Sequence, residues 1–167
     1  MPVTDQGLNQ DRYMLIPRTL IFLTRGYNIL LIKGAANKRL WANLYNGIGG
    51  HIEPGEDILS AARRELKEET SLTSDNLWLC ATVTIDTGQN PGVILFVLRG
   101  ECPHGEPLSS HEGTLEWVPI SRLDSLPLVE DLPILLERIL AMRKDQPPLA
   151  AHYSYAVNGK MIVYISE

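Results

Sequence analysis

Three glutamates at helical spacing are the residues of this chain best suited to bind a metal ion. Glu65, Glu68 and Glu69 stand at positions i, i+3 and i+4, so on a helix their side chains lie on one side, about 5–6 Å apart at Cβ. Like charges at this distance destabilise an isolated helix, whereas a divalent cation reverses the sign of the interaction. Mg²⁺ in proteins prefers a few carboxylates together with water and substrate phosphates. The spacing is therefore compatible with two structures, a solvated helix face or a magnesium site.

Residues just upstream favour the magnesium site. Gly50 and Glu56 precede the glutamates at fixed distances, and residues 46–55 include four glycines and a Pro-Gly turn. Such a segment bends sharply and can approach a ligand closely. Asp57 is a suitable N-cap for a helix that runs to about Thr70 and carries the glutamates. The sequence thus places a glycine-rich loop directly before an acidic helix.

The elements predicted elsewhere in the chain must hold this loop and helix in place. Runs of β-type residues predict strands, and an apolar period of 3.6 residues predicts a second helix. The strands are expected at 18–25, 27–33, 77–86, 93–101 and 115–119, the second helix at 130–144, and a hairpin around Asn158-Gly159 at 152–165. Strands on both sides of a helix, with another helix near the end, predict a mixed sheet between helices.

Composition limits the classes of function. The chain has 167 residues, which suits one domain, and 44% of them are hydrophobic. Its net charge of −5 argues against a general binder of nucleic acid polymers or anionic membranes, which would need a basic face. The longest apolar runs are far shorter than the ~20 residues of a membrane span. Cys80 and Cys102 are far apart and make no CxxC pair, so we expect a cytoplasmic protein.

The stretch from Gly50 to Leu72 resembles the Nudix box of the Nudix hydrolases, Gly-x5-Glu-x7-Arg-Glu-U-x-Glu-Glu-x-Gly-U, in which U is aliphatic. The matching residues are Gly50, Glu56, Arg64, Glu65, Leu66, Glu68, Glu69 and Leu72. One position departs, because Ser71 stands where the family has glycine. That glycine ends the helix in a left-handed conformation, so the departure concerns the helix end rather than the metal ligands.

The resemblance implies an α+β fold, a Nudix-type α/β/α sandwich with a mixed curved sheet. We expect the Nudix domain to span residues 17–145, with a loose N-terminal arm at 1–16 and an appended β-hairpin at 146–167. Enzymes of this family hydrolyse a nucleoside diphosphate linked to another group, with Mg²⁺ or Mn²⁺ as cofactor. The chain is accordingly expected to be an enzyme with a nucleotide substrate, and either a monomer or a homodimer.

The same resemblance implies roles for individual residues. Arg64 is expected to orient a glutamate such as Glu56, and Glu68 to act as a metal ligand or as the base. An acid from the loop before the Trp-bearing strand is also expected at the metal, and either Glu112 or Glu116 matches it, Glu112 better. The full set of implied metal ligands is the Gly49 carbonyl, Glu65, Glu68, Glu69 and Glu112. For Glu112 alone, a solvated loop position is the alternative.

The segment Asn46-Gly47-Ile48-Gly49-Gly50 is similar to the Asn-Gly-Phe-Gly-Gly segment of oxidised-purine nucleoside triphosphate diphosphatases, whose asparagine hydrogen-bonds the base. The substrate-binding residues implied by this similarity are Asn46, Lys33, Gly50, Glu130 and Asp131. Ordinary alternatives exist, since Asn46 suits a turn, Lys33 a strand end, and the acidic pair a helix N-terminus.

The function predicted from these residues is Mg²⁺-dependent hydrolysis of nucleoside triphosphates, including 8-oxo-dGTP-like oxidised purines, to monophosphate and pyrophosphate. One alternative is hydrolysis of another nucleoside diphosphate derivative, such as ADP-ribose or a dinucleoside polyphosphate. Another is a non-catalytic, nucleotide-sensing Nudix domain. The complete set of acidic residues in the box favours an enzyme.

Overall fold

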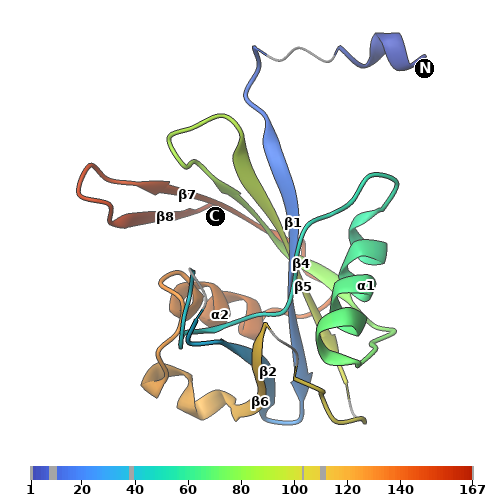
Figure 1. Ribbon diagram of the computed structural model, residues 1–167, viewed down its shortest axis with the longest axis vertical. Coiled ribbons are helices and arrows are strands. Elements are labelled where there is room, and N and C mark those ends of the chain that lie inside the picture. The colour runs from blue at the N-terminus through green and yellow to red at the C-terminus, as the bar shows by residue number, and fades with distance from the viewer. Residues whose placement is uncertain (1, 8–10, 38–39, 103, 110–111, 167) are drawn as a thin grey trace.

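The structure is a computed structural model that describes residues 2–7, 11–37, 40–102, 104–109 and 112–166. Its strands form one mixed sheet, with helices on both faces (Figure 1). The elements in chain order are η1 (Val3–Gln6), β1 (Leu15–Arg25), β2 (Asn28–Gly34), β3 (Tyr45–Asn46), α1 (Ile58–Thr70), β4 (Trp78–Ile85), β5 (Gly92–Glu101), β6 (Gly113–Pro119), η2 (Ile120–Ser125), α2 (Leu132–Ala141), β7 (Leu149–Tyr155) and β8 (Met161–Ile165).

The order of strands in the sheet is β3-β2-β1-β5-β4-β7-β8, and β6 pairs with β2 outside this path. The β1–β5 and β4–β7 pairs are parallel, whereas the other pairs are antiparallel. The predicted α+β architecture with a mixed sheet is confirmed. Among the described residues, no helix is both long and apolar enough to cross a membrane.

Two hydrophobic clusters lie on the two faces of the sheet. Successive side chains of a strand point to opposite faces, so neighbours in β1 divide between the clusters. Phe22 packs with Leu132 and Leu135 on the α2 side, whereas Ile21 packs with Leu66 on the α1 side. Each helix buries one apolar stripe, and Figure 1 shows α1 and α2 on opposite sides of the central strands.

Helix α1 begins and ends as its sequence predicts. The Asp57 carboxylate accepts hydrogen bonds from the backbone N–H of Leu59 (2.8 Å) and Ser60 (3.0 Å), which caps the N-terminus. At the other end Ser71 has φ 62° and ψ 3°, and its N–H donates to the Lys67 carbonyl. Serine therefore adopts the left-handed conformation for which the family uses glycine, and the helix end keeps its shape.

Several elements differ from the sequence-based expectation. Strand β1 begins at Leu15 rather than at 18, and β7 begins at Leu149 rather than at 152. Helix α2 ends at Ala141 rather than at 144, because Met142 is already extended (φ −75°, ψ 145°). Residues 45–46, for which no strand is predicted, form the short strand β3 against β2. The last two differences depend on tertiary packing, since neither a helix end without a Gly or Pro nor a two-residue strand has a local sequence signal.

The C-terminal hairpin continues the sheet. Strand β7 pairs in parallel with β4, from Ala81 opposite Leu149 to Ile85 opposite Tyr153, and β8 pairs with β7. Ala151 and Tyr153 belong to the buried cluster on the α2 side. The hairpin thereby becomes part of the core beside α2.

Candidate active site

The glycine-rich loop lies against β1 and against a glutamate of α1. Backbone hydrogen bonds from Thr19 N–H to the Gly50 carbonyl (2.8 Å) and from Ile21 N–H to the Ile48 carbonyl (2.6 Å) hold it there. A Cβ at Gly50 would stand 2.4 Å from Oε1 of Glu65. The Glu65 carboxylate thus occupies the space that a side chain at position 50 would need, and it is only 13% exposed.

Arg64 ties the acidic residues of this region together. Its Nε and Nη2 donate to the two carboxylate oxygens of Glu56 (2.6 and 2.9 Å), and its Nη1 donates to Glu65 (2.8 Å) and Glu68 (3.2 Å). Nη2 also donates to the carbonyl of His51 in the loop (3.0 Å). The hydrogen bonds from Arg64 lower the pKa of Glu56 to about 2, and they raise the pKa of Arg64 itself. One guanidinium therefore links the loop to both ends of the acidic cluster.

The acidic cluster has the chemistry of a site for a hard cation. Glu65 lies inward, Glu68 is 61% exposed, and Glu69 is half-buried one turn along the same helix. Within the described ranges, no three His, Cys, Asp or Glu side chains already converge as a metal cage. Carboxylates on one helix beside a backbone loop nevertheless suit Mg²⁺, which takes its other ligands from water and phosphates. The donor set fits the ion that the sequence predicts.

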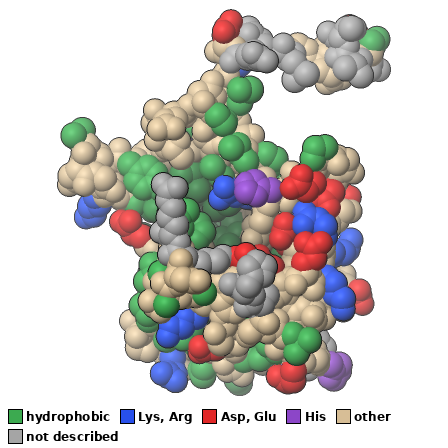
Figure 2. All heavy atoms as spheres, in the orientation of Figure 1, with side chains coloured by type: hydrophobic (Ala, Val, Ile, Leu, Met, Phe, Trp, Pro, Cys, Tyr) green, Lys and Arg blue, Asp and Glu red, His purple; other side chains and the backbone are tan. Residues whose placement is uncertain are grey.

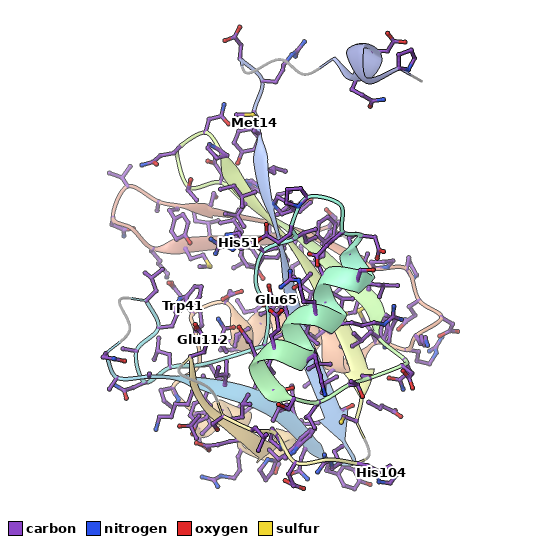
Figure 3. The ribbon with its side chains drawn as sticks, turned by 45° about the vertical axis from the view of Figure 1, so that its right-hand side comes forward. Met14, Trp41, His51, Glu65, His104 and Glu112 are labelled. Atoms are coloured by element: carbon purple, nitrogen blue, oxygen red, sulfur yellow. The ribbon has the colours of Figure 1, made fainter. Side chains whose placement is uncertain are left out.

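The structure separates the two candidates for the acid outside the box. Glu116 lies in β6 and accepts a hydrogen bond from the hydroxyl of Tyr45 (2.9 Å). Glu112 immediately precedes β6, where its carbonyl accepts from the N–H of Ala35 (3.3 Å). Figure 3 shows Glu65 on α1, Glu112 at the start of β6 and His51 in the glycine-rich loop. Glu116 thus has a structural partner in Tyr45, and both acids stay candidates.

The predicted base-binding residues come from neighbouring segments. Tyr45 N–H donates to the Pro127 carbonyl (2.9 Å) and Val129 N–H donates to the Tyr45 carbonyl (3.1 Å), so β3 runs beside the segment that leads into α2. This pairing brings Asn46 close to Glu130 and Asp131. Oδ1 of Asn46 accepts from Gly47 N–H (2.8 Å), which is the turn role, and its amide N–H₂ is still available as a donor.

Lys33 and the acidic pair differ in their surroundings. The Lys33 ammonium lies 5.6 Å from the centre of the Tyr45 ring, a cation–π distance. Glu130 is exposed, whereas Asp131 is buried, and burial raises the pKa of the Asp131 carboxyl. The Asp131 side chain makes no cap hydrogen bond to α2. Asp131 nevertheless stands at the N-cap position of α2, so the alternative of acids at a helix N-terminus stays open.

Part of the apolar surface on the α2 side of the sheet is not fully covered. Side chains such as Ile85, Leu95 and Val163 pack against the cluster there and are only partly buried. Figure 2 shows a hollow on the surface with hydrophobic side chains on its floor and acidic side chains gathered next to it. An apolar floor suits a flat aromatic ring, and an acidic edge suits metal-bound phosphates.

Sequence reasoning did not assign two polar groups near the site. Arg18 in β1 donates from Nε to Nε2 of His51 (3.1 Å), beside the glycine-rich loop. Tyr153 in β7 has a buried hydroxyl within the electrostatic reach of Asp131. Only the apolar alternation of the hairpin could have indicated that Tyr153 points inward, and no pattern links Arg18 to His51.

Comparison with known proteins agrees with this geometry. The NUDIX domain model matches residues 14–139. The chain is 30% identical over 125 residues to the oxidized purine nucleoside triphosphate hydrolase of Danio rerio, which covers 72% of this chain and 79% of that protein. It is 26% identical over 136 residues to the NAD-capped RNA hydrolase NudC of Stutzerimonas stutzeri, covering 80% of this chain and 47% of that one.

Solved structures give the same result for the fold. The MutT protein of Bacillus halodurans superposes with a TM-score of 0.76 at 24% identity, over 90% of this chain and 97% of that chain. An Ap4A hydrolase of C. elegans superposes with a TM-score of 0.56 at 21% identity, over 76% and 96% of the two chains. With its box, fold and matched family model, the chain belongs to the Nudix hydrolases.

Proposed function

We propose that the enzyme hydrolyses purine nucleoside triphosphates, oxidised purines included, to nucleoside monophosphate and pyrophosphate with Mg²⁺ as cofactor. The observation that carries the proposal is the position of Glu65, whose carboxylate lies on the Gly50 backbone and is held by Arg64. The names of the Danio rerio and Mus musculus relatives, both oxidized purine nucleoside triphosphate hydrolases, support the substrate class.

Each residue at the phosphate end has a definite task in this proposal. Glu65, Glu68, Glu69, the Gly49 carbonyl and Glu112 would hold the ion, which when bound neutralises phosphate charge and lowers the pKa of a coordinated water. Arg64 orients Glu65 and Glu68 through one nitrogen, and the paired Glu56 keeps the guanidinium in place. Glu68 is the most exposed of the three glutamates, so its side chain has room to take the proton of the attacking water. Water attacks phosphorus, and the P–O bond to pyrophosphate breaks.

The base end supplies recognition rather than chemistry. The Asn46 amide and the Asp131 carboxyl belong to adjacent segments, which the hydrogen bond from Val129 N–H to the Tyr45 carbonyl joins. A purine edge offers donors and acceptors side by side, which such a pair can match. Lys33 and Glu130 lie near them as further contacts, and Gly50 lets the substrate approach the loop backbone.

A substrate panel tests the proposal. Purine and pyrimidine nucleoside triphosphates, 8-oxo-dGTP, ADP-ribose and a dinucleoside tetraphosphate are assayed for released phosphate products with Mg²⁺. We expect the highest kcat/KM for a purine triphosphate, with pyrophosphate as product. Higher activity on ADP-ribose or the dinucleoside polyphosphate would overturn the substrate class, and binding without turnover would indicate a sensing domain.

A variant tests the site itself. Glu69→Gln removes one ligand charge with little change in shape, so turnover is expected to fall by about 10²–10⁴-fold while the protein stays folded. Glu137→Gln, an exposed change in α2, is the matched control and should keep full activity. Unchanged turnover in Glu69→Gln would refute the assignment of the acidic cluster.

A further inference from the structure

The hydroxyl of Tyr153 is a buried polar group that lacks a hydrogen-bond partner. The side chain is 1% exposed, and within the described part of the chain no group accepts from or donates to its Oη. Burying a hydroxyl unpaired costs free energy, and nearly all buried polar side-chain atoms in proteins are paired. A phenylalanine would fill the same space without this cost. The hydroxyl therefore needs an explanation outside the folding of the free protein.

The charged group that acts electrostatically on Tyr153 is Asp131. Its side chain is also buried, at 8% exposed, and it makes no cap hydrogen bond to α2; its own backbone N–H is the hydrogen-bond donor to the carboxylate. The negative charge of Asp131 acts on Tyr153, where it adds to burial in raising the pKa of the phenol. The Tyr153 hydroxyl, a donor without a partner, therefore lies within the electrostatic reach of a buried carboxylate, and no hydrogen bond joins the two.

The fold explains how these two residues meet. Tyr153 lies opposite Ile85 in the parallel β4–β7 pair, and its carbonyl accepts from the N–H of Asp86 (2.8 Å). Its ring packs in the same cluster as Leu132 and Leu135 of α2. Asp131 immediately precedes Leu132, so the residue before α2 adjoins the cluster in which the Tyr153 ring is buried. The C-terminal hairpin therefore contributes the Tyr153 side chain to the core.

We propose that Tyr153 is a positioning residue for Asp131 during recognition of the purine base. The inference rests on the proposed function and extends it to a residue of the C-terminal hairpin. Because Oη is sealed from solvent, it acts through the carboxylate: it donates to one oxygen of Asp131, and the other oxygen accepts an N–H of the base. The hydrogen bond forms when the base fixes the carboxylate, which is why the Tyr153 hydroxyl has no partner in the free protein.

Equilibrium binding of nucleoside monophosphates tests this proposal without requiring catalysis. Calorimetry is used to compare dGMP, dAMP and dCMP on the wild type and on Tyr153→Phe. We expect a purine monophosphate to bind about tenfold more weakly to Tyr153→Phe, the effect of losing one hydrogen bond to a charged group. Binding of dCMP should change little. The melting temperature of the variant should equal or exceed that of the wild type, because the lost hydroxyl is unpaired in the free protein.

Tyr155→Phe is the matched control. Tyr155 lies two residues along the same strand and also senses the charge of Asp131, but it is 47% exposed. Its loss should leave base binding unchanged. An equal weakening in both variants would indicate a general disturbance of β7 and would overturn the proposal.

A double-mutant cycle shows whether Tyr153 acts through Asp131. In the Asp131→Asn background, Tyr153→Phe should have no further effect on purine binding, and additive effects would overturn the inference. In turnover, Tyr153→Phe should raise KM with less than about a twofold change in kcat. The two proposals can fail separately. Hydrolysis of a different nucleotide class by the wild type would overturn the proposed function, whereas the double-mutant cycle, which measures binding alone, would still test the role of Tyr153.

Discussion

The two ends of the site are built in different ways. At the phosphate end, the glycine-rich loop and helix α1 follow one another in the chain, and Arg64 bonds to Glu56, Glu65 and Glu68 within a span of 13 residues. At the base end, Lys33, Asn46, Asp131 and Tyr153 come from four segments that only the sheet brings together. In the proposed function, the reaction thus depends on a local module, whereas the choice of base depends on the assembled sheet.

The two ends also differ in how their polar groups are paired. At the phosphate end the carboxylates already accept hydrogen bonds from Arg64, so this end is organised before substrate arrives. At the base end, Asp131 and Tyr153 are buried without a hydrogen bond to each other. Groups that are positioned before the substrate binds favour turnover. Polar groups that only the correct base can pair favour discrimination between bases, because a wrong base leaves them without a hydrogen bond.

The largest effect that separates the two ends is expected for Glu65→Gln. The carboxylate lies on the Gly50 backbone, and its loss removes the innermost proposed ligand. We expect kcat to fall at least about 100-fold, whereas the KM for the nucleoside triphosphate should change little. Steady-state kinetics at saturating Mg²⁺ measures both parameters. A rise in KM alone would mean that Glu65 serves binding and not turnover.

Arg64→Lys should have the next largest effect. A lysine ammonium carries three donors on one atom and cannot reproduce the planar fork by which Arg64 bonds twice to Glu56 and also to Glu65 and Glu68, so the carboxylates lose part of their common partner. Activity is expected to fall about 10–100-fold, as for other groups that orient metal ligands. The Mg²⁺ concentration for half-maximal activity should rise as well. Arg63→Lys, at the exposed neighbouring position, is the control and should behave like the wild type.

Asp131→Asn should weaken recognition of the base without affecting the metal site. The change keeps the shape but replaces an acceptor oxygen by a donor, so a purine N–H loses its partner. The ratio of kcat/KM for purine over pyrimidine triphosphates is expected to fall about tenfold, while the Mg²⁺ dependence stays unchanged. Competition between the two triphosphates in one reaction measures the ratio directly. An unchanged ratio would remove Asp131 from base recognition.

The smallest effect concerns stability and its dependence on pH. The pKa of Glu56 is lowered to about 2 in the folded protein, from an ordinary value of 4.5, mainly by hydrogen bonds from Arg64. A lowered folded-state pKa contributes stability that is fully present above the ordinary value and is lost as the pH falls toward 2. Urea unfolding should therefore show Glu56→Gln to be less stable than the wild type at pH 7. The difference in the free energy of unfolding between the two proteins should become smaller between pH 4.5 and pH 2. A difference that does not depend on pH would contradict the lowered pKa of Glu56.

Much of the phosphate end could be predicted from sequence because its interactions are local. One short segment, residues 56–70, contains the Asp57 cap, the helix that carries the glutamates and the Arg64–Glu56 pair. Helical periodicity and capping preferences act over such distances. The left-handed Ser71 shows the limit of motif matching, since a residue outside the pattern adopts the same backbone conformation.

The base end and the hairpin were decided by tertiary structure. The alternation of residues 149–155 indicates a strand, but nothing in it indicates parallel pairing with β4. Strand pairing over long sequence separations depends on which apolar faces the whole sheet must bury, which no local window contains. The sequence by itself determined an acidic helix behind a glycine-rich loop, because a single turn of helix sets that geometry. Only the folded sheet buried both Asp131 and Tyr153, because burial of two polar groups from distant segments is a property of the assembled core.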